Sequence, residues 1–178
     1  MSAVVLIYRV TGTVAASTVT NITSGSCHAG TSDSNTSPCK IQVPTSGSNY
    51  SYWVTEQLSA SVAPDNSLTN VFFYTDGGNG FGTGVDAIVI PASGYASATG
   101  TAGSSGTLLT VANYGPTACA ATSNLFLYTS SCKLTLTGSL GATTGSFANR
   151  VVLQLSVVST AAAGNTSSEV MTFQYDEA

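Results

Sequence analysis

Few residues of this chain could carry acid–base chemistry, and Glu56 is the most notable of them. It falls in the apolar register of its segment, between Val54 and Leu58, which predicts a partly buried carboxyl group. Such a group can act as a general acid, as in glycoside hydrolases, but that reaction needs a second carboxylate across the sugar. No other acid lies in an apolar register, so a structural setting is favoured: a bulge, a strand end, or a pairing with Arg9 or Arg150.

A second conceivable site is a cation site in the glycine-rich segment 76–86. Asp76, Asn79 and Asp86 could ligate calcium through side-chain and carbonyl oxygens. Their spacing does not match the EF-hand loop, however, and Asp-Gly and Asn-Gly are common turn dipeptides. We therefore interpret this segment as a structural turn.

Two further arrangements lack a suitable partner. A Ser–His–Asp triad would have to use His28, the single histidine, and the sequence contains no Gly-x-Ser-x-Gly motif. Trp53 could stack on a sugar with Tyr50 and Tyr52, but strand alternation places it on the opposite face, which favours core or interface packing. The sequence therefore predicts no enzyme, no cofactor and no metal site.

The four cysteines fall as two local pairs, Cys27 with Cys39 and Cys119 with Cys132. Three disulfide connectivities are possible, and sequence alone does not select one. We favour the two short-range pairs because each encloses a small Ser/Thr/Ala-rich loop; free thiols or a metal site are the alternatives. Disulfides indicate an oxidising compartment, and the scarcity of Lys and Glu argues against a hyperthermophile's cytosol. We therefore expect an extracellular or cell-surface location.

Charged residues are scarce throughout the chain. Four Lys or Arg and eight Asp or Glu make up 7% of the 178 residues, where about 25% is usual, and 26 serines, 26 threonines and 18 glycines take their place. A soluble monomer normally relies on surface charge, so this surface is expected to be covered by neighbours, sugar or matrix. The four scattered cations argue against nucleic-acid binding, and no apolar run is long enough to span a membrane.

Four Asn-x-Ser/Thr sequons permit glycosylation without demanding it, because a chain this rich in Ser and Thr contains about three by chance. They begin at Asn21, Asn35, Asn49 and Asn165. Glycans, or host and cell surfaces, are therefore conceivable partners.

Apolar residues alternate with period two along most of the sequence, and amphipathic helical patterns are nearly absent. This predicts a single all-β domain, a β-sandwich of about eight or nine strands that is immunoglobulin-like, pilin-like or jelly-roll-like. The expected strands cover residues 3–15, 50–62, 70–75, 85–90, 107–112, 125–137, 147–158 and 169–175. Residues 93–106 are expected to form an exposed loop.

The N-terminal segment is about twice as long as a typical strand. One face carries Val4, Leu6, Tyr8, Val10 and Val14, with Gly12 in the same register, and Arg9, Thr11 and Thr13 lie on the other. The apolar face needs burial, since an uncovered strand of this kind is a template for aggregation. We therefore divide the chain into an assembly strand, residues 1–15, and a β-sandwich domain, residues 16–178.

Taken together, the low charge, local cysteine pairs, all-β pattern and long apolar N-terminal strand resemble the pilin-like subunits of bacterial and archaeal surface filaments. In chaperone–usher pilins an N-terminal extension fills the groove of the next subunit, and Gly12 matches the small residue found in that extension. The segment Met171–Tyr175 also resembles a closing pilin strand. The resemblance implies a filament made of copies of the chain, joined by donated strands. A viral capsid or virion-surface β protein and a secreted carbohydrate-binding or adhesin module are the alternatives.

Overall fold

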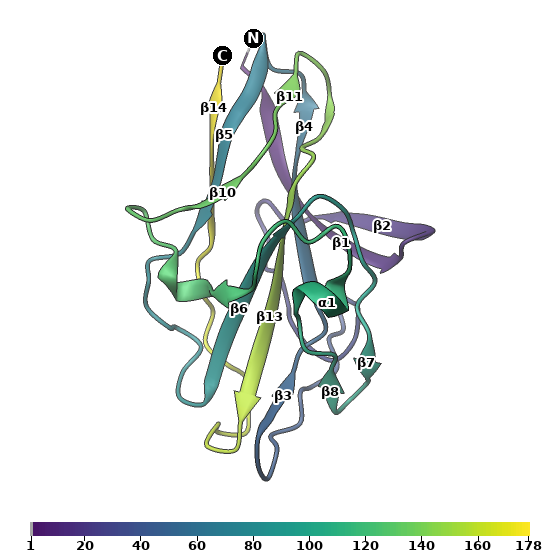
Figure 1. Cartoon of the computed structure of the whole chain (residues 1–178), viewed down its shortest axis with the longest axis vertical. Helices are drawn as coiled ribbons and strands as arrows, with labels where there is room; N and C mark the ends of the chain where they lie inside the picture. Colours follow the sequence, from purple (N-terminus) through teal and green to yellow (C-terminus); the bar gives the residue numbers. More distant parts are fainter. Residues whose placement is uncertain (1) are drawn as a thin grey trace.

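The computed structural model describes residues 2–178 and is built almost entirely from antiparallel β-sheets (Figure 1). This confirms the predicted all-β, sandwich-like fold. Within the described residues, helix is limited to the short α1 (Val111–Tyr114) and a 3-10 turn, η1 (Leu125–Leu127).

Sheet A is the larger of the two main sheets and follows the order β2-β1-β4-β13-β6-β9, with β12 pairing with β4 and β3 with β13. Its strands are β1 (Val4–Thr13), β2 (Ala16–Asn21), β3 (Ser48–Tyr50), β4 (Val54–Val62), β6 (Val85–Ala92), β9 (Ser123–Asn124), β12 (Gly145–Ser146) and β13 (Arg150–Val158).

Sheet B is built around β5 (Ser67–Tyr74). β10 (Leu134–Leu136) and β11 (Leu140–Gly141) pair with one side of β5, and β14 (Thr172–Glu177) pairs with the other. A small separate hairpin joins β7 (Gly100–Thr101) to β8 (Ser105–Gly106). The two chain ends lie close together at one end of the molecule (Figure 1).

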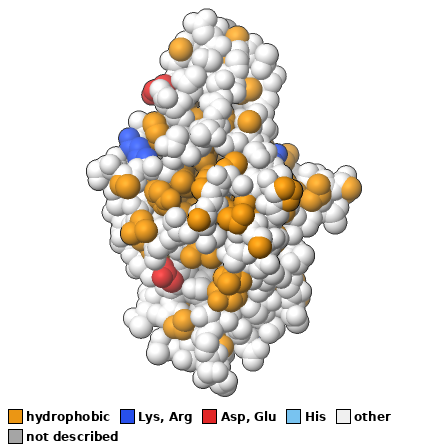
Figure 2. All heavy atoms as spheres, viewed as in Figure 1, with side chains coloured by type: hydrophobic (Ala, Val, Ile, Leu, Met, Phe, Trp, Pro, Cys, Tyr) orange, Lys and Arg blue, Asp and Glu red, His pale blue; other side chains and the backbone are white. Residues whose placement is uncertain are grey.

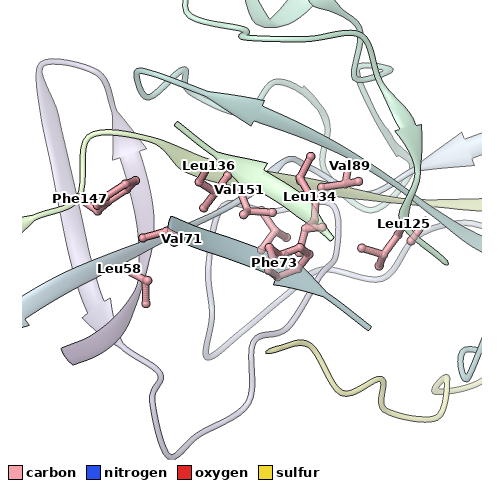
Figure 3. Close-up of a cluster of buried hydrophobic side chains, with 12 residues drawn as sticks. Leu58, Val71, Phe73, Val89, Leu125, Leu134, Leu136, Phe147 and Val151 are labelled. Atoms are coloured by element: carbon pink, nitrogen blue, oxygen red, sulfur yellow. The ribbon is translucent and has the colours of Figure 1, made fainter. Parts of the chain in front are cut away.

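The main core lies between the two sheets because each presents its alternate apolar residues to the other. Leu58 of β4, Phe73 of β5 and Val151 of β13 meet there (Figure 3). From β14, Phe173 packs edge-on against Phe73 with 5.0 Å between the ring centres, and Met171 and Tyr175 also contact this core, as expected. A second, smaller core on the other face of sheet A contains Trp53, Leu109, Tyr114 and Val152.

Four segments differ from the sequence-based expectations. Residues 93–106 were expected to form an exposed loop, but they contain the β7–β8 hairpin, and most of them are half-buried. Residues 107–112 were expected to form a strand, but the Thr110 side chain accepts a hydrogen bond from the Asn113 N–H and caps α1. Within residues 125–137 only β10 is a strand of the main sheets, because Asn124 caps the 3-10 turn η1 in the same way. β2 is an additional strand, in a region expected to be rich in turns.

Charged side chains are sparse on the molecular surface. On the face shown in Figure 2 they are isolated, with apolar side chains exposed between neutral polar ones. Among residues 2–178 no helix has the length and apolar character needed to cross a membrane.

Candidate assembly site

The expected assembly strand corresponds to β1, which lies within sheet A of its own chain. Its residues Val4 to Val10 pair with β4, and its residues Tyr8 to Thr13 pair with β2. Residue 1 of the expected segment 1–15 lies outside the described residues. In the isolated chain, β1 therefore completes its own sheet.

The face of β1 that meets the main core differs from the expected one. Val5 and Ile7 pack against this core, so the residues of the alternate register, including Leu6 and Tyr8, point to the other side. On that side Val10 is only 3% exposed, whereas Leu6 and Tyr8 are half-buried and Val4 is 46% exposed. The face that the sequence analysis identified for burial is thus only partly covered in the isolated chain.

A two-residue turn, Val14-Ala15, joins β1 to β2, since Thr13 pairs with Ala16. Two-residue hairpin turns usually need Gly, Asn or Asp with positive φ. Neither turn residue has positive φ, and Val14 is 64% exposed. Gly12 supplies the irregular conformation instead, with φ of +97°, and a Cβ there would lie 2.7 Å from the carbonyl oxygen of Ala16. The turn thus depends on Gly12 rather than on its own residues.

Asp33 holds the turn end of this hairpin against the body of the molecule. Its Oδ2 accepts hydrogen bonds from the Gly12 N–H (2.6 Å) and the Tyr95 hydroxyl (3.1 Å). The same hydroxyl lies 2.7 Å from the Gly12 carbonyl oxygen, so its single hydrogen is shared between these two acceptors. Burial, and then the Asp33 charge, raises the pKa of Tyr95, so this hydroxyl stays protonated. Asp33 and Tyr95 therefore form a polar clasp around Gly12.

The strongest departure from the sequence analysis is Arg9, which was placed on the polar face of β1 but is 0% exposed and faces the core side. It lies opposite Glu56 of β4 in the β1–β4 register, but the ion pair of its guanidinium is with Asp33, so the expected pairing of Glu56 with Arg9 stays a prediction. The guanidinium donates to the Cys27 sulfur at 3.5 Å and to the His28 carbonyl, and it lies 3.9 Å from Asp33.

Glu56 is 4% exposed, and burial raises its pKa, although a hydrogen bond from Cys27 and the charge of Arg9 act in the opposite direction. Burial, followed by the nearby Glu56 charge, also raises the pKa of the Cys27 thiol to about 12. The thiol is therefore protonated at neutral pH and is not an activated nucleophile. The cluster is a buried polar contact between β1 and β4.

A cavity of about 1080 Å³ adjoins this cluster. Sheet A lines it with Glu56, Leu153 and Ile7, and segments 22–29, 38–43 and 161–171 line the other sides. Ile7 is the residue of β1 that contributes to its wall. Removal of β1 would therefore take away part of this wall.

The remaining sequence candidates do not converge on a chemical site. Asp76 caps the Gly78 N–H (2.8 Å), Asn79 bonds to the backbone of its own loop, and Asp86 accepts from Asn124 (3.2 Å). Trp53 is buried in the second core, where its Nε1 donates to the Thr107 carbonyl at 2.9 Å. No cluster of three or more His, Cys, Asp or Glu that could hold a metal occurs in residues 2–178.

All four cysteines are free thiols in the structure, so the expected disulfides are not formed in it. Cys27 is directed into the Arg9–Glu56 cluster, whereas Cys39 is exposed. Cys119 and Cys132 are both exposed. The Cys27–Cys39 and Cys119–Cys132 pairings thus stay predictions.

The four sequons differ in their surroundings. Asn21 and Asn165 are exposed, although the Asn21 side chain accepts hydrogen bonds from Thr23. Asn35 and Asn49 are half-buried and donate to the carbonyls of Ser26 (3.1 Å) and Gln42 (2.8 Å). The Nδ2 groups of Asn35 and Asn49 are thus engaged in hydrogen bonds, whereas the Asn21 and Asn165 side chains are exposed.

The chain matches no protein-family model, and searches of curated proteins and of solved structures find no match. The resemblance to pilin-like subunits therefore stays a prediction.

Sequence reasoning missed Asp33 and Tyr95 as parts of the site, and it placed Arg9 on the wrong face of β1. Arg9 follows apolar residues in both registers, so the alternation did not show which face is the inner one. Asp33 and Tyr95 lie far apart in the sequence and carry no local signal. The one available hint was Gly12 beside a strongly β-branched segment, which indicates a turn or a bulge.

Proposed function

We propose that the chain is a structural subunit of an extracellular filament in which β1 of each copy inserts into the sheet of the next. The insertion site is the position that β1 occupies within its own chain, between β4 and β2. Because this contact is head-to-tail, it propagates instead of closing on itself. The partner is thus another copy of the same chain.

The observation that supports the proposal most strongly is the unfavourable turn that joins β1, a strand well paired with β4, to β2. β1 pairs with β4 along seven residues, from Val4 to Val10, but is tied to β2 by the Val14-Ala15 turn, which lacks favourable turn residues. Short hinge loops under strain favour exchange of an element between copies. The exchanged form keeps the contacts of β1 and releases the turn.

The length of the hairpin is sufficient for this exchange. If the turn opens, residues 4–21 become one extended segment of roughly 60 Å, at about 3.3 Å per residue. β2 can then stay in place and pair with the incoming β1 of the neighbouring copy. The Arg9–Glu56 pairing and the contacts of Val5 and Ile7 re-form between chains.

A label-mixing experiment tests where β1 lies in the assembled material. A photo-reactive residue replaces Leu6, which is paired with Ser59 of β4. ¹⁵N-labelled and unlabelled subunits are mixed as monomers, allowed to assemble and irradiated, and cross-linked peptides are identified by mass spectrometry. Exchange predicts that about half of the β1–β4 cross-links join a labelled to an unlabelled peptide. Filaments in which every such cross-link joins peptides of one label would refute strand exchange.

Electron microscopy of the native material separates the proposed function from its alternatives. Negative-stain images of fibres agree with a filament subunit. Closed shells would instead indicate a virion-surface protein, and dispersed monomers would indicate a carbohydrate-binding or adhesin module.

A further inference from the structure

We infer that the outer edge of β2 is a second contact between copies of this chain, through which filaments associate side by side by antiparallel β2–β2 pairing. The inference rests on the proposed function in that it takes another copy as the partner. It concerns a different surface, because β1 occupies the inner edge of β2 whether it belongs to the same chain or to a neighbour.

Within the described residues, β2 pairs with β1 alone and ends sheet A. All six of its residues, Ala16 to Asn21, are exposed. In Figure 1 the β1–β2 hairpin projects from the side of the molecule. Its unpaired backbone groups are therefore accessible to a flat partner such as another strand.

β2 also differs in charge from the other edges of the two main sheets. β14 ends in Asp176 and Glu177, and Lys133 directly precedes β10. The opposite edge of sheet A, β9, is only two residues long. Charges and short length are the usual means by which proteins block edge-to-edge pairing. β2 has neither protection.

The absence of charge also points to a second copy as the partner. Residues 10–32 contain no Lys, Arg, Asp or Glu, so two β2 strands meet without like-charge repulsion. The strand is rich in Thr and Val, which pair well across strands. A charged partner would have no oppositely charged side chain to pair with on β2. Self-pairing is therefore the arrangement that fits this edge best.

One such contact is small, since six residues form less than the interface that a stable dimer usually buries. A filament, however, presents one β2 edge per subunit at regular intervals. Two filaments can then form many contacts at once, and the effective concentration strengthens each contact after the first. The expected consequence is bundling of filaments rather than a stable dimer of free subunits.

The test uses full-length protein with a charge placed at the centre of β2. Wild type, Thr18→Lys, Thr18→Glu and an equimolar mixture of the two variants are assembled and compared by low-speed sedimentation and electron microscopy. In the antiparallel register that pairs Thr18 with Thr18 of the other copy, like charges should weaken each strand contact roughly fivefold, so each single variant gives dispersed filaments. In the same register the mixture should bundle again because Lys and Glu then face each other. Thr143→Lys, in the exposed loop between β11 and β12, is the matched control and should bundle as wild type does.

The outcomes distinguish this inference from the proposed function. Bundling of Thr18→Lys at the wild-type level would overturn the inference, as would a mixture that stays dispersed. If wild type forms no filaments, the proposed function fails, and the same four samples are compared as concentrated free subunits by sedimentation velocity. Self-association of wild type, Thr143→Lys and the mixture, but of neither Thr18 variant alone, would still support β2 pairing, and its absence would overturn it.

Discussion

The buried pair formed by Arg9 and Glu56 is the residue-scale feature that most affects the behaviour of this protein. Burying two ionisable groups costs free energy that their mutual attraction only partly recovers. Here Nε and Nη2 of Arg9 have no hydrogen-bond partner, and burial is the dominant influence on Glu56. The two buried groups therefore add little to the stability of the fold.

The raised pKa of Glu56 predicts that stability depends on pH. A carboxyl group whose pKa is higher in the folded state binds its proton more tightly there, so its favourable contribution is complete below the unfolded pKa and is lost as pH rises through the folded pKa. Glu56→Gln keeps the shape and removes this titration. We expect the variant to gain on wild type as pH rises from about 4 to 8, by on the order of 1 kcal/mol in the free energy of unfolding at neutral pH.

Urea unfolding at a series of pH values measures this difference. Glu177→Gln, the same substitution at an exposed position near the C-terminus, is the control for the loss of one negative charge. A constant difference between Glu56→Gln and wild type across the range would mean that Glu56 does not titrate in this way.

At the scale of elements, the β1–β2 hairpin combines a strand that pairs well with β4 and a turn whose residues are unfavourable for a turn. The Asp33–Tyr95 clasp and the conformation of Gly12 both act at the closed end of the hairpin. Neither is needed once residues 12–16 are extended. The closed hairpin and the exchanged strand are thus two states whose balance local changes at the turn can shift.

Gly12→Ala should shift that balance toward exchange. In the closed hairpin the new Cβ would lie 2.7 Å from the Ala16 carbonyl oxygen, at a φ that side chains rarely adopt. We expect a loss of about 1–2 kcal/mol in monomer stability. Assembly, followed by light scattering, should become faster because the opened state is unaffected. Gly141→Ala, where a Cβ meets open space, should change neither quantity. Slower assembly of Gly12→Ala would contradict a hinge at this turn.

Whether the sequence predicted an element depends on the interactions that hold that element in place. β1, β4, β6 and β13 bury alternate apolar side chains, so their patterns were visible. β2 was missed because its six residues are exposed and backbone pairing with β1 holds it in place. Thr110 and Asn124 cap α1 and η1, so two apolar segments that were expected to be strands contain short helices instead. Capping residues are a local signal, and the prediction gave more weight to the apolar alternation.

The sequence predicted only part of the site, again because an apolar pattern shows some buried positions but does not always show which face of a strand is the inner one. Glu56 was identified because it interrupts an apolar register in a strand that is otherwise regular. Arg9 was misplaced because residues 4–8 are apolar in both registers, and a polar residue next to them was taken to mark the outer face. Only the packing of Val5 and Ile7 against the main core shows which face is inside.

At the scale of the whole molecule, the low charge and the dependence of the fold on β1 both favour a protein that is stable when it is associated with other copies of itself. Net charge is −4 over 178 residues, so electrostatic repulsion between copies is weak. Val10 is buried and Val5 and Ile7 are half-buried, so the three side chains together contribute less than three times the roughly 1.5–3 kcal/mol of one fully buried side chain. Even part of that sum is a sizeable share of the total stability of a typical domain, about 5–15 kcal/mol. The domain formed by residues 16–178 should therefore be incomplete alone.

Deletion of residues 1–15 tests this dependence directly. The truncated chain should be largely unfolded or soluble without forming fibres, since β4 loses its neighbour and the cavity beside Glu56 loses part of its wall. Adding the free peptide of residues 1–15 should restore the circular dichroism of the fold but not filament length, because the peptide fills the site without carrying a further subunit. A peptide with Val5→Asp and Ile7→Asp is the matched control and should restore neither. A truncated chain that still polymerises normally would show that β1 is not the assembly strand.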